Sequence, residues 1–329
     1  MPLWINPQDG TQDVAVLLFD RFSNYCLANT IEPMRAANDY LGRPAYRWRL
    51  VSLDGAPVTS SSGLRLLPDG RLAEQPGGDA LFVLPSYGYR ELGTPACLDA
   101  LRAAARRYES LIGLDTGSWL LAEAGLLNGY AATIHVDEFE RFSERFPEVT
   151  ARRERWLIDR DRVSAGGATT AFELMQHLIE ATHGSVVSLE IAGLFMQGED
   201  SIRSMAAGTP GDRRVQRALA LMRGNIEAPL HIAEISRAAG CRQRDLEERF
   251  RRAFGAAPRT VYRQIRMAEA LRLVREGDLS VAEIALRCGY SDPSAFTRSF
   301  RRTYGRPPRA ASARTGARTT APNPTGAVK

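Results

Sequence analysis

The feature that most constrains the fold is an imperfect repeat in the last third of the chain. Residues 232–258 match residues 281–308, with equivalent positions 49 apart up to the glycine of each copy and 50 apart from Leu246 onward. Each copy has the pattern of two amphipathic helices separated by a glycine turn, at Gly240 or Gly289, which is typical of a helix-turn-helix. The repeat therefore predicts an all-α domain with two helix-turn-helix units.

The segment between the two copies, residues 260–276, predicts one amphipathic helix of about four turns. At a rise of 1.5 Å per residue, such a helix holds the two units about 25 Å apart. Two recognition helices at this spacing could enter successive major-groove segments on one face of DNA, whose helical turn is about 34 Å. The spacing indicates double-stranded DNA as a partner.

Charge divides the chain at the same place. Residues 1–211 hold 19 basic and 27 acidic side chains, a net charge of −8, whereas residues 212–329 hold 24 and 11, a net charge of +13. All but one of the basic residues in the second part are arginine, which is suited to bidentate contacts with phosphate and guanine. This separation favours a sensor or enzyme domain joined to a nucleic-acid-binding domain.

The first 200 residues alternate strands with helices. Apolar or alternating runs predict strands at 13–20, 46–53, 79–86 and 110–115, and helical periodicity predicts helices at 31–42, 95–109 and within 155–184, followed by a helix at about 186–203. Strands and helices that alternate in this way form a parallel sheet with helices on both faces. The predicted class is α/β, with a flavodoxin-like sheet followed by the all-α domain.

A stretch of small residues, prolines and glycines coincides with the change of charge sign. We therefore expect four parts, a ligand-sensing domain at 11–205, a linker at 206–212, a DNA-binding domain at 213–310 and a disordered tail at 311–329. The chain has no apolar run long enough to cross a bilayer and no secretory signal at its start, which predicts a cytoplasmic protein without a membrane partner. Its four cysteines and four histidines lack the spacing of metal ligands, and we expect no metal or cofactor.

The stretch GLDTGSWLLAEAGLLNGYAATIH, residues 113–135, has the order strand, tight turn, helix that carries the nucleophile in many α/β enzymes. We call residues 113–117 the elbow; its tip is Asp115-Thr116-Gly117. An aspartate cannot replace a cysteine in acyl transfer, and Thr116 has no evident activating base nearby. The sequence therefore predicts no catalytic residue, and the elbow becomes a candidate ligand site at the carboxyl ends of the strands.

The carboxyl-terminal residues that pair across the repeat, among them Ala233-Glu234-Ile235 with Ala282-Glu283-Ile284, resemble the AraC/XylS family of bacterial transcription regulators. The segments LLFDRFS, IEPMRAAN, YRWRLVSLDG and SSGLRL, the stretch at 113–135 and SAGGATTAFELMQHLIEATHG resemble the class I glutamine amidotransferase-like fold in its PfpI-type branch, as found in GlxA-type AraC regulators. Enzymes of that branch carry a cysteine at the tip, often a histidine beside it, and a glutamate from the first helix. The resemblance matches Asp115, Thr116 and Glu32 to these three positions.

The resemblance implies a ligand site at Asp115, Glu32, Thr116, Trp119 and His135. Paired carboxylates would favour a cation and Trp119 an aromatic contact with it, as for the amino acids and quaternary amines (arginine, carnitine, glycine betaine) that such regulators answer to. Other interpretations stay open: Asp115 caps the elbow helix, Trp119 belongs to the core, and His135 is a structural histidine. Gly166 and Gly167 either turn the chain or offer amides to a ligand carboxylate.

Residues Leu246, Phe250, Phe296 and Phe300 mark the buried faces of the two second helices, so polar residues on the other faces are candidates for DNA contact. The candidates are Arg242, Gln243, Arg244 and Glu247 in the first copy and Ser294, Thr297, Arg298, Arg301 and Arg302 in the second. Ser294, Thr297 and Arg298 match the groove-facing positions of the family, whereas Arg301 and Arg302 suit phosphate contacts. Glu248 repels phosphate and makes the first copy the weaker candidate for base readout.

These observations predict a regulator, an activator by resemblance, that binds promoter DNA and responds to a small-molecule effector. The resemblance also implies a homodimer and contact with RNA polymerase. Two alternatives remain, a hydrolase or lyase domain fused to a DNA-binding module, and an architectural DNA-binding protein that senses nothing.

Overall fold

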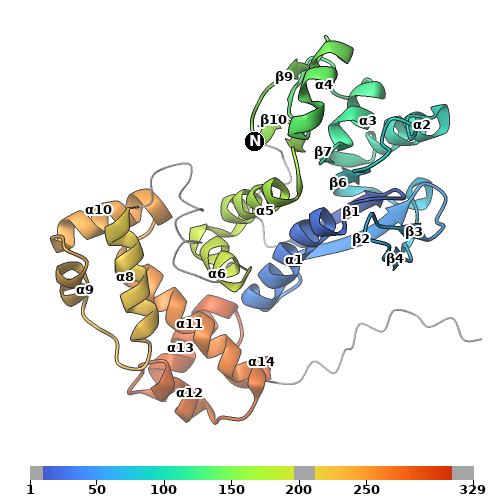
Figure 1. Cartoon of the computed structure of the whole chain (residues 1–329). Helices are drawn as coiled ribbons and strands as arrows, with labels where there is room; N and C mark the ends of the chain where they lie inside the picture. Colours follow the sequence, from blue (N-terminus) through green and yellow to red (C-terminus); the bar gives the residue numbers. More distant parts are fainter. Residues whose placement is uncertain (1–9, 196–211, 313–329) are drawn as a thin grey trace, which may run out of the picture. The chain divides into compact units, whose positions relative to one another are not determined.

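The computed structural model describes residues 10–195 and 212–312, which belong to two separate compact units on either side of the 211–212 boundary (Figure 1). The expected linker up to residue 211, the end of the helix expected at about 186–203 and the tail beyond residue 312 lie outside the described residues. In the two described ranges no helix is both long and apolar enough to span a membrane.

The first unit is built on a seven-stranded sheet with the order β10-β11-β7-β6-β1-β2-β5. All neighbouring strands in this sheet are parallel except β10 and β11. The strands are β1 (Gln12–Leu18), β2 (Tyr46–Ser52), β5 (Gly70–Arg71), β6 (Gly78–Leu84), β7 (Tyr108–Leu114), β10 (Trp156–Asp159) and β11 (Arg162–Ala165). Two short pairs accompany it, β3 (Val58–Thr59) with β4 (Arg65–Leu66) and β8 (Ala131–Ala132) with β9 (Thr150–Ala151).

Helices pack on both faces of the sheet, which confirms the predicted α/β class. Alternate residues of β1 enter different cores: Val14 and Val16 pack with α1 and α5, whereas Ala15 and Leu17 pack with α2, α3 and α4. The first group of helices is α1 (Asn24–Leu41), α5 (Ala168–His183) and α6 (Ser185–Phe195), and the second is α2 (Pro95–Ala104), α3 (Gly117–Glu123) and α4 (Phe139–Arg145). Because both faces are covered, the central strands are almost wholly apolar.

Two predicted boundaries in this unit were wrong. Helix α1 begins at Asn24 rather than at residue 31, because the side chain of Ser23 accepts a hydrogen bond from the Cys26 N–H at 3.2 Å and caps the helix. Helix α2 ends at Ala104 rather than at residue 109, and the chain turns there into strand β7, which begins at Tyr108.

The second unit is wholly helical within the described residues. Its helices are α8 (Arg213–Gly224), α9 (Ile232–Ala238), α10 (Gln243–Phe254), α11 (Pro258–Glu276), α12 (Val281–Arg287), α13 (Pro293–Tyr304) and α14 (Pro308–Ser312). The pairs α9–α10 and α12–α13 are the two predicted helix-turn-helix units, with α11 between them (Figure 1). Phe250, Phe296 and Phe300 are fully buried, as their spacing predicts. The last helix includes Ala311 and Ser312, two residues that the sequence analysis assigned to the tail at 311–329.

Helix α11 holds the two helix-turn-helix units through side chains one turn apart. The Tyr262 hydroxyl donates to the Asn225 carbonyl and accepts from the Leu230 N–H, which fixes the segment leading into α9. The Arg266 guanidinium donates to the carbonyls of Cys288 at 2.7 Å and Gly289 at 2.8 Å, which fixes the turn of the second unit. These partly buried contacts with one helix help to set the relative orientation of the two units.

The two turn glycines have different surroundings although both have a left-handed backbone, with φ of +76° at Gly240 and +72° at Gly289. A Cβ atom added at Gly289 would lie 2.4 Å from Cγ of Pro229 and 2.7 Å from the Ile226 carbonyl oxygen. No atom lies within 4 Å of the corresponding position at Gly240. Only the second turn therefore needs glycine for close packing as well as for its backbone angle.

We expect Gly289→Ala to lower the free energy of unfolding by about 2–4 kcal/mol, because left-handed strain of about 1–2 kcal/mol adds to overpacking. Gly240→Ala is the matched control and should cost only the strain, about 1–2 kcal/mol. Chemical denaturation of both variants measures the difference. Equal losses in the two variants would show that the contact with Pro229 does not restrict the second turn.

Candidate functional site

The elbow has the strand-turn-helix geometry that its sequence predicts. Strand β7 ends at Leu114, and Asp115 takes a left-handed φ of +59° before α3 begins at Gly117. The Asp115 N–H donates to the Ala165 carbonyl at 2.9 Å. A Cβ at Gly117 would lie 2.1 Å from the Val83 carbonyl oxygen, so only glycine allows the helix to approach strand β6 this closely. The tip is therefore held rigidly at the carboxyl ends of the strands.

The carboxyl group of Asp115 meets Ser86, which follows strand β6. Burial raises the pKa of Asp115 above its ordinary value, and the hydrogen bond from Ser86 and the charge of His135 oppose this rise. The Ser86 hydroxyl also accepts from the Ser23 N–H at 2.9 Å, and the Ser86 carbonyl accepts from the Thr116 hydroxyl at 2.7 Å. Ser86 thus ties the elbow to the start of α1.

Glu32 does not join Asp115, contrary to the expected pair of carboxylates. Its side chain is 41% exposed and pairs with the Arg35 guanidinium at 2.7 Å on the surface of α1. The α1 residue that senses Asp115 is Cys26, which is fully buried; burial and then the charge of Asp115 raise the pKa of its thiol well above the ordinary value. Cys26 lies in the two turns of α1 that precede the predicted start of the helix and that Ser23 caps, so the sequence prediction did not consider it.

Trp119 belongs to the hydrophobic core, which is one of the two roles that the sequence left open; the other was a contact with the ligand. It is 8% exposed, and its ring lies 5.3 Å from the ring of Tyr89 and 5.0 Å from that of Phe146. The Arg90 guanidinium already lies over it, 5.7 Å from the ring centre. Trp119 therefore supports the elbow helix from inside and leaves its aromatic face unavailable.

Two other interpretations of the elbow are now distinguished. The capping position of α3 is occupied by Thr116, which is buried and makes no side-chain cap, so Asp115 does not cap the helix. His135 is joined to the tip, since its backbone N–H donates to the backbone carbonyl of Asp115 at 3.1 Å. Its Nδ1 accepts from the Asp137 backbone N–H at 3.4 Å, as expected of a structural histidine.

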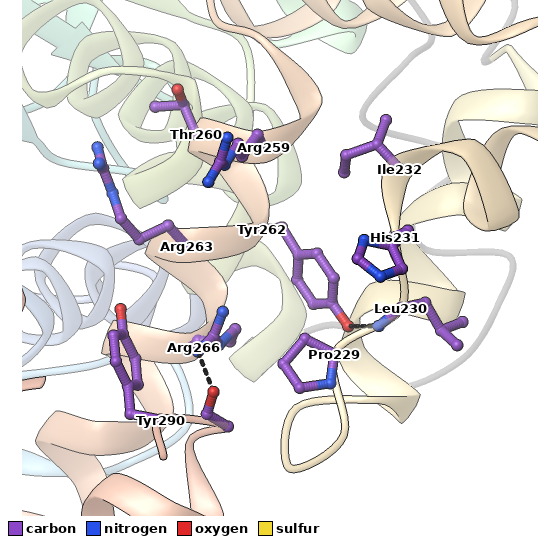
Figure 2. A pocket seen from close by; sticks show the side chains of 11 residues that line it. Pro229, Leu230, His231, Ile232, Arg259, Thr260, Tyr262, Arg263, Arg266 and Tyr290 are labelled. Atoms are coloured by element: carbon purple, nitrogen blue, oxygen red, sulfur yellow. Dashed lines mark hydrogen bonds between the residues drawn. The ribbon is translucent and has the colours of Figure 1, made fainter. Parts of the chain in front are cut away.

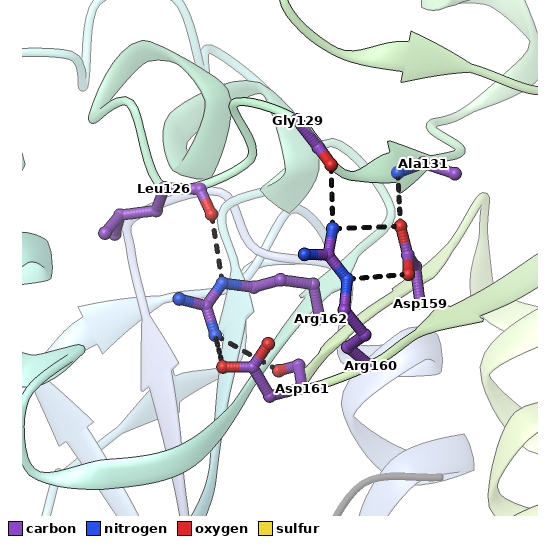
Figure 3. A network of polar contacts seen from close by, with 7 residues as sticks. All are labelled: Leu126, Gly129, Ala131, Asp159, Arg160, Asp161 and Arg162. Carbon is purple, nitrogen blue, oxygen red and sulfur yellow. Dashed lines mark hydrogen bonds and ion pairs between the residues drawn. The ribbon is translucent and has the colours of Figure 1, made fainter.

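Hydrogen bonds from the β10–β11 turn hold the loop that leads from α3 towards His135 (Figure 3). Arg162 donates to the Leu126 carbonyl at 2.9 Å and Arg160 to the Gly129 carbonyl at 2.7 Å. The Ala131 N–H donates to the Asp159 carboxylate at 2.8 Å. These contacts hold the loop at three points before the chain reaches His135, whose own backbone N–H bonds to the tip.

The N-terminus of α5 lies beside His135. Its capping residue is Gly167, which provides no side chain, and a Cβ there would lie 3.7 Å from Cδ2 of His135. A 16-residue helix presents partial positive charge and N–H groups without intrahelical partners at this end. The elbow region thus combines a carboxyl group on Asp115 with a helix end that favours an anion.

The nine candidate DNA contacts lie on the two recognition helices, α10 and α13, or at their first residues. Seven are exposed, and Glu247 and Thr297 are half-buried. Gln243 donates to the Glu247 carboxylate at 3.0 Å, so these two side chains bind each other when DNA is absent. Arg298 is 72% exposed and its Nη2 lies 3.7 Å from the carboxylate of Asp292, which caps α13.

Sequence reasoning missed a pocket of about 720 Å³ between the two helix-turn-helix units (Figure 2). It is lined by Pro229, Leu230, His231, Ile232, Arg259, Thr260, Tyr262, Arg263, Arg266, Gly289 and Tyr290. Three of these are arginines on the first turns of α11, at spacings of four and three residues. That spacing places them on one helix face and was the available signal.

Comparisons with known proteins cover almost the whole chain. The sequence model of the DJ-1/PfpI family matches residues 12–181, and that of a helix-turn-helix domain matches residues 235–314. The HTH-type transcriptional regulator CdhR of Pseudomonas aeruginosa is 34% identical over 91% of this chain and 90% of its own length. The regulator GbdR of the same organism is 33% identical over 93% of this chain and 85% of its own length. A crystal structure of an AraC family transcriptional regulator from Pseudomonas putida is 28% identical, with a TM-score of 0.49, over 56% of this chain and 100% of its own.

We expect Asp115→Asn to stabilise the protein at pH 7. Burial raises the pKa of Asp115 in the folded state, so ionisation of this group costs folding free energy as the pH rises through and above its ordinary pKa. The gain from the substitution should shrink as the pH falls towards 4, where the carboxyl group becomes protonated. Urea denaturation at pH 4 and pH 7 measures this difference. Asp99→Asn, at a site with a 73% exposed side chain, is the control; a gain at Asp115 that does not depend on pH would contradict the assignment.

Proposed function

Because this chain belongs to the GlxA-type regulators of the AraC family, with a DJ-1/PfpI domain followed by a double helix-turn-helix, we propose that it is a ligand-responsive, sequence-specific regulator of transcription. The observation that carries the DNA-binding half is the pair of recognition helices, α10 and α13, one in each helix-turn-helix unit on either side of α11 in the chain, within a segment of net charge +13. The base contacts come from Ser294, Thr297 and Arg298 at the start of α13, with Arg242 and Arg244 in the first unit.

The first domain acts as a sensor and not as an enzyme. Its elbow presents an aspartate, and the Thr116 hydroxyl is engaged with the Ser86 carbonyl. The thiol of Cys26, whose pKa the charge of Asp115 affects, is fully buried and its pKa is raised, which keeps it protonated and unreactive. These contacts weigh against the alternative of a hydrolase or lyase domain fused to a DNA-binding module.

The effector is a small zwitterion, either an amino acid or a quaternary amine such as arginine, carnitine or glycine betaine. Each of these molecules carries at least one cationic group and one carboxylate; arginine carries a guanidinium as well as its ammonium group. Asp115 would contact the cation, and the N-terminus of α5 beside His135 would contact the carboxylate. Thr116 contributes by holding Ser86 against the tip, whereas Glu32 and Trp119 have no direct part.

Control of transcription requires only that the effector bind one arrangement of the domains, or of a homodimer, more tightly than another. The free energy of effector binding then shifts the population that holds promoter DNA. Activation through RNA polymerase completes this proposal. The alternative of an architectural DNA-binding protein predicts no response to any effector, so a response to an effector distinguishes a regulator from it.

Thermal-shift measurements on the full chain test the effector class. Arginine, carnitine and glycine betaine form the panel, and a positive shift with one of them identifies the class. Asp115→Asn should weaken that binding by about 1.5–3 kcal/mol, about 10- to 150-fold, because it removes a charge-assisted contact. Asp99→Asn should leave the shift intact, and an unchanged shift in Asp115→Asn would remove Asp115 from the site.

Operator binding tests the recognition residues. Arg298→Ala should weaken binding to the operator by about 1–3 kcal/mol and relax the preference at one base pair, because Arg298 contacts a base edge. The control is Arg217→Ala, an exposed arginine on α8 outside both helix-turn-helix units. If footprint and affinity are the same in both variants and the wild type, Arg298 does not read a base.

A further inference from the structure

The pocket between the two helix-turn-helix units has no part in base readout, because none of the residues that line it belongs to a recognition helix. It is bounded by the start of α9 at His231, by the first turns of α11 and by the turn before α13 at Tyr290 (Figure 2). All its walls lie in the second unit. Its volume of about 720 Å³ leaves room for a group that enters from outside.

The pocket is strongly basic. Arg259 and Arg263 lie one turn apart on α11, both are exposed, and within the described residues neither makes an ion pair. No acidic side chain lines the pocket. Two unpaired guanidinium groups at this spacing, facing a hollow without a counter-charge, suit a phosphate or a pair of neighbouring phosphates.

The third arginine has a different role. Arg266 donates to the carbonyls of Cys288 and Gly289, and its guanidinium lies over the Tyr290 ring, 4.4 Å from the ring centre. Its donors are therefore turned towards the second unit. Arg266 is a positioning residue that sets the width of the pocket.

The position of the pocket identifies the source of the phosphate. In a helix-turn-helix the first helix crosses the DNA backbone, and the recognition helix enters the major groove by its N-terminal residues. The pocket joins the N-terminal end of α9 to the turn only three residues before α13 begins at Pro293. A duplex held by both recognition helices would carry its backbone from one unit to the other, and the pocket lies between the two units.

We propose that the pocket binds the phosphates of the DNA backbone between the two recognition sites, through Arg259 and Arg263. This inference rests on the proposed DNA-binding function and adds a contact that carries no sequence information. It also gives the pocket a mechanical role, since a phosphate bound there contacts α11 while both units hold their groove segments.

The experiment measures binding of the full chain to its operator and to unrelated DNA over a range of salt concentrations. The test variant is Arg259→Gln with Arg263→Gln, and the control is Arg217→Gln on α8. Loss of two phosphate contacts should reduce the slope of log K against log salt by about 1.8, which corresponds to about 30-fold weaker binding at 0.15 M salt. The loss should be equal for both DNAs, so the ratio of the two affinities stays constant.

Three results would overturn the proposal. The first is a slope equal to that of the wild type and of Arg217→Gln. The second is a change in the ratio of operator to unrelated affinity, which would make these arginines readers of bases. The third is a thermal shift caused by inorganic phosphate without DNA and lost in the double variant, with an unchanged slope, which would assign the pocket to a free anion. A wild-type chain that shows no preference for any operator would instead refute the proposed function itself.

Discussion

The attachment of both helix-turn-helix units to helix α11 is the constraint on which the DNA-binding surface depends. Tyr262 holds the segment before α9, and Arg266, one turn later, holds the turn before α13. The absence of a side chain at Gly289 lets that turn touch Pro229 of the opposite unit directly. Because these partly buried contacts form within the folded domain, they set the spacing of the recognition helices independently of DNA. The basic pocket is a consequence of the same arrangement.

The first domain obeys a comparable constraint with a different result. The approach of α3 to strand β6 at Gly117 fixes the elbow, and this backbone would present any tip residue in the same way. The tip residue in this chain is an aspartate. Ser86 binds the carboxyl group, and the Cys26 thiol opposite stays protonated. The elbow, which carries a catalytic residue in related enzymes, thus presents the partly buried carboxyl group of Asp115 in this chain. Burial of that group is tolerable only because partners such as Ser86 bind it.

The error at Glu32 shows where prediction from sequence ends. Periodicity correctly indicated a helix at 31–42 but not its first two turns, which Ser23 adds by capping. Those turns bring Cys26 to the elbow and leave Glu32 on the surface with Arg35. Trp119 posed a similar problem, since an aromatic residue one turn into the elbow helix suits a ligand contact as well as a core. Its packing against Tyr89 and Phe146 decided the matter.

The sequence by itself determined the fold class, the double helix-turn-helix and the family. Hydrophobic periodicity, the internal repeat and the separation of charge can all be read from the order of residues along the chain, without knowing which residues meet in space. It also placed Asp115 at the tip of the elbow. Only the tertiary structure decided which groups surround Asp115 and that Arg259 and Arg263 line a pocket with Tyr290. Such groupings join residues far apart in sequence, and they depend on helix starts, side-chain packing and the spacing of whole elements. No local pattern encodes these distances.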